Sequence, residues 1–216
     1  MRRSIVFSVF LGLMMSCIAW PARSEIKAGS SELNLYVGGF IGLDKSYFEE
    51  DIIPYDFEDM ASDPGTGVVG GMSLTWNFTP YIGIEGGMAL SSADFDAVYY
   101  IDEQEIKGEE IGASLGGSEF MGYTNLVLHL LPESRIVPFL TGGVGFMHLW
   151  GTAEANGYEE DWSETHFCAN WGGGVKIFVS ETWLFRINVR NFNLKLEDSR
   201  DRFNWLEVSG GISFLF

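Results

Sequence analysis

The sequence predicts an all-β protein, an eight-stranded antiparallel up-and-down barrel. Two observations predict this fold class. Eight separate stretches have the composition of strands, and in seven of them apolar and polar residues alternate with a period of two, as they do in strands whose two faces meet different surroundings. The connections between the stretches are alternately long and short, which places all tight turns at one end of an antiparallel meander. Closure into a barrel also removes the unpaired edges that an open eight-stranded sheet would expose.

The composition supports a packed domain. The chain has 216 residues, 46% of them hydrophobic, with 13 Lys and Arg against 30 Asp and Glu and a formal net charge of −17. A disordered acidic chain lacks this much apolar side chain. Nucleic-acid binding is not expected, because phosphate recognition depends on Lys and Arg.

The first 24 residues have the organisation of an export signal. Two arginines precede an uncharged stretch from 4 to 20, and Pro21 and small residues, among them Ser24, follow it. We expect cleavage after Ser24, which leaves 25–216 as the barrel domain. A retained anchor helix is the alternative. Lipidation of Cys17 is a lesser one, because Met rather than Leu stands three residues before it.

The first four strands are predicted at 32–43, 66–78, 81–91 and 118–131, where every second residue tends to be apolar. The apolar sides carry, strand by strand, Leu33, Leu35, Val37, Ile41 and Leu43; Val68, Met72, Leu74, Trp76 and Phe78; Ile82, Ile84, Met88 and Leu90; and Leu126, Leu128 and Leu130. The opposite sides carry mainly Gly, Ser, Thr, Asn and Tyr. Each strand therefore has two faces suited to different surroundings.

The last four strands are predicted at 136–150, 165–179, 183–195 and 205–216. Three of them alternate, with apolar sides that carry Phe167, Ala169, Trp171, Val175 and Ile177; Phe185, Ile187 and Val189; and Leu206, Val208, Gly210, Ile212, Phe214 and Phe216. The strand at 136–150 has apolar residues at both parities, so its orientation stays open.

The seven connections differ sharply in length. Turns at 79–80, 132–135 and 180–182 are short, whereas loops at 44–65, 92–117, 151–164 and 196–204 are long. An even number of strands places both termini at the short-turn end. The four long loops hold 23 of the 30 acidic residues, so the negative charge gathers at the opposite end.

Alternation also fits a soluble, lipocalin-like barrel whose apolar face points inward. Three observations favour an apolar exterior and hence a transmembrane β-barrel. The polar face lacks the dense Lys and Glu of a soluble surface. Aromatic residues on the apolar face gather beside the short turns, as in an interfacial girdle. The chain closes an alternating strand with a terminal Phe216.

Five segments carry a resemblance to a known family. They are WNFTPYIGIEGGM (76–88), YTNLVLHLLPESRIVPFLTGGVGF (123–146), WGGGVKIF (171–178), LFRINVRNF (184–192) and VSGGISFLF (208–216). In this order they resemble the turns and strands of the OmpA-like, eight-stranded outer-membrane β-barrel family of Gram-negative bacteria, without its periplasmic peptidoglycan-binding domain. The resemblance implies that Phe216 is the signal read by the barrel assembly machinery.

Four charged residues stand on the polar side of the predicted strands. Glu85, Lys176 and Arg186 fall at similar distances from the short turns, and Arg190 lies about one step further. The interior of an eight-stranded barrel is just wide enough for its own side chains. We therefore predict that these four form a charge network in the lumen, in which Glu85 pairs with Arg186 or Arg190 because an unpaired buried charge is costly. A gated ion path is the alternative.

Three histidines and one cysteine are the candidates for chemistry. A lipid A deacylase is expected to carry a His-x-Ser pair, but the residues two positions after His129, His148 and His166 are Leu, Trp and Cys. His166 and Cys168 share a strand face, yet a metal site needs more ligands and catalysis needs an orienting acid. His129 is expected to face the lumen. The acidic loop clusters lack the ligand spacing of a calcium loop. We predict no catalytic, metal-binding or cofactor-binding residue, and no cofactor.

The predicted function is that of a non-enzymatic integral outer-membrane barrel with a structural or surface-interaction role. Short turns are expected in the periplasm and acidic loops outside the cell. A narrow porin-like channel for small or cationic solutes is the alternative, because an acidic mouth concentrates cations; a lipid A-modifying enzyme is a third. The expected partners are outer-membrane lipid and lipopolysaccharide, the barrel assembly machinery, and an extracellular partner of the loops that the sequence does not identify.

Overall fold

The computed structural model describes residues 25–43, 46–48, 59–63, 66–101, 104–107, 114–155, 158–195 and 202–216. The predicted signal segment lies outside the described residues. Eight long strands are β1 (Ser31–Gly42), β4 (Thr66–Asn77), β5 (Ile82–Ile101), β7 (Ser114–His129), β8 (Ile136–Ala155), β9 (Tyr158–Phe178), β10 (Trp183–Lys195) and β11 (Arg202–Leu215). Three short strands are β2 (Ser46–Phe48), β3 (Asp59–Asp63) and β6 (Gln104–Lys107). In this part of the chain, no helix is long and apolar enough to span a bilayer.

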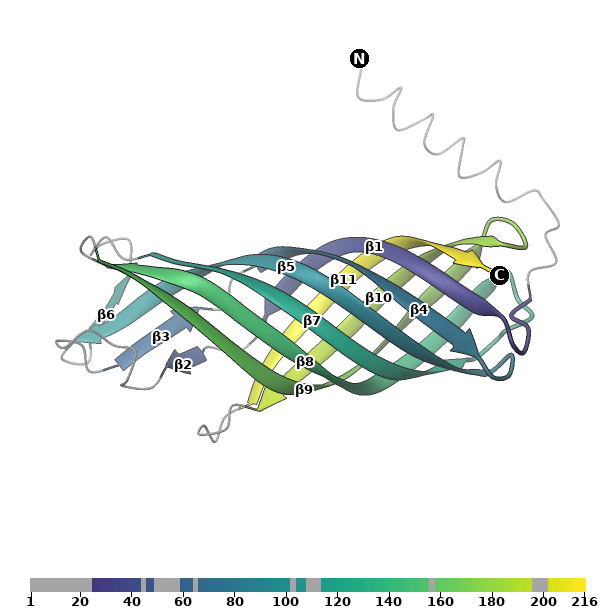
Figure 1. The fold of residues 1–216 in the computed structure, drawn as a ribbon, viewed down its shortest axis with the longest axis horizontal. Coiled ribbons are helices and arrows are strands. Elements are labelled where there is room, and N and C mark those ends of the chain that lie inside the picture. Colours follow the sequence, from purple (N-terminus) through teal and green to yellow (C-terminus); the bar gives the residue numbers. More distant parts are fainter. Residues whose placement is uncertain are drawn as a thin grey trace, which may run out of the picture.

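The eight long strands form a closed antiparallel barrel, which confirms the predicted fold class (Figure 1). Each strand pairs with its neighbours along the chain, and β1 closes the ring by pairing with both β4 and β11. The pairing of β5 with β7 completes the circle. The carboxyl end of the chain lies at the end with the short turns, and β2, β3 and β6 lie at the other end (Figure 1).

Pairing continues further than the sequence predicts. The expected loops at 92–117 and 151–164 are wrong in part, because β5 runs to Ile101 and β8 and β9 form a ladder as far as Ala155 opposite Tyr158. Apolar alternation marks only the part of a strand with an apolar exterior. Backbone hydrogen bonds of the ladder need no apolar face, so they extend the strands into polar sequence.

The structure resolves the orientation of the strand at 136–150. In β8, Ile136, Leu140 and Val144 point outward and are more than half exposed, whereas Val137 and Phe139 are buried inside. Apolar residues occur at both parities because this barrel is apolar outside and also uses large apolar side chains to fill its interior. On the other seven long strands, the apolar side that the sequence predicts is the outward one, as Leu35 on β1 and Ile212 on β11 illustrate.

The short-turn end is closed by the segment that precedes β1. Ile26 is fully buried and packs with Val137, Phe178, Leu184 and Leu215. The backbone N–H of Ile26 donates to the carbonyl of Pro132 at 3.1 Å, which ties this segment to a short turn. Gly29 has a φ of +81°, a conformation that suits glycine, where the segment turns into β1. The barrel therefore ends in an apolar layer below its polar interior.

Inward-facing glycines make room for large rings inside the barrel. A Cβ atom at Gly71 would collide with the ring of Tyr36 at 2.7 Å, and one at Gly174 would collide with Phe139 at 2.8 Å. Each ring thus lies close to a neighbouring strand that has no side chain at that point. These rings occupy space that would otherwise be open lumen.

Candidate functional site

The charged interior of the barrel is the candidate site. The inward sides of β1, β5, β9, β10 and β11 supply six charged residues that form ion pairs with one another, namely Glu32, Glu85, Lys176, Arg186, Arg190 and Glu207. None of the six side chains is more than 1% exposed. Each stands on the polar parity of its strand, so the pleat alone directs it into the lumen.

Glu85 is the centre of this network. Its Oε2 lies 2.5 Å from Nη1 of Arg186, and its Oε1 lies 3.3 Å from Nη2 of Arg190. Ser73 and Thr75 on the adjacent β4 donate hydrogen bonds to Oε2 at 3.4 and 3.2 Å. The structure thus brings Glu85 together with both arginines that the sequence offered as alternative partners.

Lys176 belongs to a second layer, nearer the short turns. Its Nζ forms a salt bridge with Glu32, and lies 3.0 Å from Nε2 of His129. Nη1 of Arg186 lies 3.6 Å from Oε1 of Glu32 and links this layer to Glu85. His129 faces the lumen and is 1% exposed.

Glu32 and Glu207 were not singled out from the sequence. Glu207 lies 3.8 Å from Nη1 of Arg190 and accepts a hydrogen bond from Ser209 at 2.6 Å. Both glutamates occupy the polar parity of β1 and β11, which is the signal that could have found them. The three carboxylates and three basic side chains of this network leave it without formal net charge. A fourth buried carboxyl group, Glu119 on the inward side of β7, lies outside the network.

Aromatic rings cover the faces of the two guanidinium groups. Cζ of Arg186 lies 4.6 Å from the ring centre of Phe139, and Cζ of Arg190 lies 4.2 Å from that of Tyr123. The hydroxyl of Tyr123 is 3.2 Å from that of Tyr36 across the lumen. Burial of a charge is tolerated only with such partners, since desolvation otherwise outweighs the attraction between ions. The result is a filled cross-section held by ion pairs and rings.

The remaining predicted residues lie apart from this network. His148 faces outward, and its Nδ1 is 2.7 Å from Oγ1 of Thr165. His166 is 2.8 Å from Oε2 of Glu164, and Cys168 is buried two residues further along β9. In the described part of the chain, no three His, Cys, Asp or Glu side chains group in a way that would hold a metal ion.

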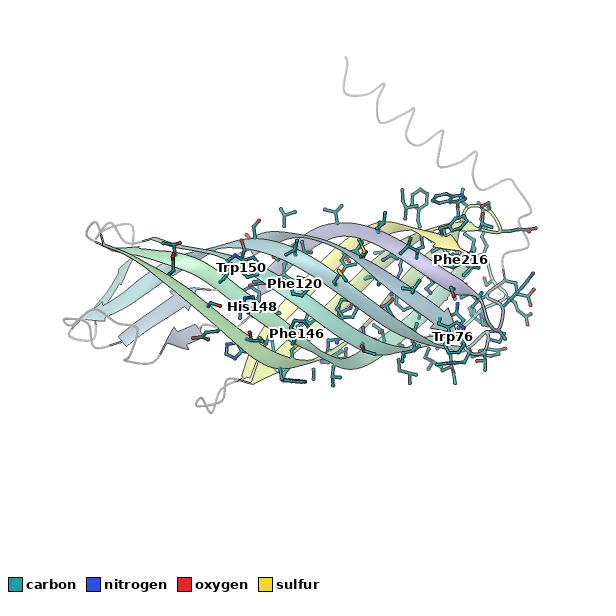
Figure 2. All side chains as sticks on the ribbon, viewed as in Figure 1. Trp76, Phe120, Phe146, His148, Trp150 and Phe216 are labelled. Carbon is teal, nitrogen blue, oxygen red and sulfur yellow. The ribbon has the colours of Figure 1, made fainter. Side chains whose placement is uncertain are left out.

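The exterior carries aromatic residues near the short turns. The rings of Trp76 and Phe78 are 4.6 Å apart, and those of Trp183 and Phe214 are 5.1 Å apart. Phe216 is 63% exposed, and its backbone N–H donates to the carbonyl of Ser31 at 2.8 Å. Trp76 and Phe216 lie at this end of the barrel (Figure 2). The wall between the two ends exposes large apolar side chains on every strand, far more than a water-facing surface carries.

A family model described as the outer membrane protein beta-barrel domain matches residues 8–214. No curated protein sequence matches the chain. Among solved structures, the outer membrane protein OprG from Pseudomonas aeruginosa is similar at a TM-score of 0.57 and 11% identity, covering 90% of this chain and 99% of that one. A major outer membrane protein from Thermus thermophilus has a TM-score of 0.57, 11% identity and coverage of 86% and 99%. Neisserial surface protein A has a TM-score of 0.54, 10% identity and coverage of 87% and 99%.

Proposed function

Because this chain belongs to the outer membrane protein beta-barrel domain family, we propose that it is a non-enzymatic integral barrel of that membrane with a structural or surface-interaction role. The observation that carries the proposal is the closed interior, in which Glu85 is held by Arg186 and Arg190 and no member of the network is exposed. A filled lumen with a charge-balanced network suits a rigid scaffold. Recognition then falls to the loops, which is where rigid scaffolds usually carry it.

A narrow channel is the second candidate, because acidic residues gather at the long-loop end and would concentrate cations. Single-channel recording in planar bilayers separates the two functions. We expect no steady current through the wild-type protein and intermittent current through Glu85→Ala, since this change removes the carboxylate that holds two guanidinium groups together. A general porin in the same bilayers is the positive control. Strong and equal conductance of both proteins would contradict the closed lumen.

The proposed orientation places the short turns in the periplasm and the long loops outside the cell. It is supported by the closure of the short-turn end, where Ile26 and Leu215 bring the two ends of the barrel sequence together. A protein delivered from the periplasm leaves both ends on that side when strands insert as hairpins. Outer-membrane lipid, lipopolysaccharide and the assembly machinery are the corresponding proposed partners.

Cysteine labelling on intact cells tests the orientation. Asp161 at the long-loop end and Glu181 in a short turn are both exposed. With a membrane-impermeant maleimide, Asp161→Cys is expected to react on whole cells and Glu181→Cys only after the outer membrane is permeabilised. The native Cys168 is buried, so the unmodified protein is the background control. The reverse labelling pattern would overturn the orientation.

A further inference from the structure

A groove of about 440 Å³ lies on the outside of the barrel, toward the long-loop end. It spans four neighbouring strands, β5, β7, β8 and β9, and is lined by Leu90, Phe120, Phe146, His148, Trp150 and Thr165. Figure 2 shows the four labelled members, Phe120, Phe146, His148 and Trp150, close together on this wall and far from Trp76 and Phe216.

Strand register builds the groove. Leu90 pairs with Phe120, Phe120 with His148, and His148 with Thr165, so one row of outward side chains crosses four strands. In the next outward row toward the short turns, Phe146 pairs with Gly122. A Cβ atom at Gly122 would lie 2.6 Å from the Phe146 ring, which shows that the ring rests across this glycine. Phe146 therefore lies close against β7, with its ring centre 5.8 Å from that of Phe120, and the two rings line the groove together.

The groove lies at the margin of the apolar wall. Its lining contains no Asp, Glu, Lys or Arg, and Leu90 and Phe146 are exposed members of the apolar exterior. In the next outward row toward the long-loop end, Trp150 pairs with Ser118 and Ser163, so the outer wall becomes polar one row beyond the groove. Nδ1 of His148 is occupied by Thr165 at 2.7 Å, which leaves Nε2 for a ligand. A mainly apolar ligand with one polar group at the end nearer the long loops fits this arrangement.

We propose that the groove binds an acyl chain of lipopolysaccharide, with the ester or amide that joins the chain to its sugar near Nε2 of His148. The groove is continuous with the lipid-facing wall, so its occupant comes from the bilayer. The absence of charged lining residues indicates that the chain and its neutral linkage are bound, not a phosphate. The choice of lipopolysaccharide rests on the proposed orientation, which places this margin in the outer leaflet, where that lipid replaces phospholipid.

Native mass spectrometry of the detergent-purified protein tests the site with added lipid A as the probe. Wild type is expected to bind one lipid A tightly. Leu90→Trp fills part of the groove and is expected to weaken lipid A binding about ten-fold. This is the loss expected when about two methylene groups of the acyl chain are no longer buried in the groove. Leu35→Trp is the matched control, because Leu35 is 54% exposed on the same apolar exterior and Leu90 is 58% exposed. Heat-modifiable mobility on gels confirms that each variant is folded.

His148→Phe tests the polar contact separately. It is expected to weaken lipid A binding while leaving the binding of free fatty acid unchanged, because only the linkage contact is lost. Equal lipid A binding by Leu90→Trp and Leu35→Trp would overturn the site. Equal binding of phosphatidylglycerol and lipid A by wild type would overturn the assignment to lipopolysaccharide. A lipid-free dimer that Leu90→Trp abolishes would instead identify a second copy as the occupant.

Failure of the orientation is distinguishable from failure of the site. Lipid A binding in detergent does not depend on which way the barrel is inserted in the membrane. The labelling of exposed cysteines on cells reports that orientation and does not depend on lipid A binding. Reversed labelling together with intact, Leu90-dependent lipid A binding would refute the orientation alone.

Discussion

Replacement of Glu85 by alanine is expected to destabilise the barrel by about 3–5 kcal/mol, the usual cost of removing one partner from a buried ion pair. The loss is large because Arg186 and Arg190 both contact this carboxylate and are almost fully buried. Their other carboxylates lie further away, at 3.6 Å for Glu32 and 3.8 Å for Glu207. Two guanidinium groups would therefore keep their desolvation cost while losing their closest counter-ion.

Urea unfolding of the protein in lipid vesicles, followed by tryptophan fluorescence, measures this loss. Glu181→Ala is the control, because it removes an exposed glutamate from a short turn and is expected to change stability by less than about 0.5 kcal/mol. Glu85→Ala should also lose its heat-modifiable mobility at a lower temperature than wild type. Equal stability of the two variants would show that the interior network does not hold the barrel together.

Replacement of Ile187 by arginine is expected to destabilise the membrane-inserted barrel by about 2–4 kcal/mol, as for a charge near the bilayer midplane. Ile187 is 51% exposed on the outer face of β10, between the aromatic Trp183 near the short turns and the polar Asn191. An exposed arginine on a water-facing surface would cost almost nothing. The size of this effect therefore reports which solvent meets the exterior.

Ser163→Arg is the control for this change. Ser163 is exposed on the same outer face but lies beyond the apolar margin, where the expected cost is about 0–1 kcal/mol. Both variants are compared with wild type by unfolding from vesicles. A negligible effect at Ile187, together with a stable protein in buffer without detergent, would contradict the membrane-facing exterior and revive a soluble barrel.

Local sequence determines much of the interior but not its pairing. The parity of Glu85, Arg186 and Arg190 on their strands predicts that all three point inward. Their distances from the short turns predict a similar depth for Glu85 and Arg186, with Arg190 about one step further. Which arginine Glu85 meets depends on how far each strand is shifted along its neighbours. That shift accumulates around the ring, so the answer, contact with both, required the closed barrel.

The sequence by itself determined the number of transmembrane strands, their approximate positions and the inner and outer faces of seven of them. These features follow from the two-residue repeat of a pleated strand and from the length of each connection, which are local properties. Only the tertiary structure decided the orientation of β8, the extension of β5, β8 and β9 beyond the apolar wall, the closure by Ile26, the contacts of Glu32 and Glu207, and the outer groove. Each of these depends on contacts between strands or between a strand and a segment outside it, and the alternation of any one strand carries no information about such contacts.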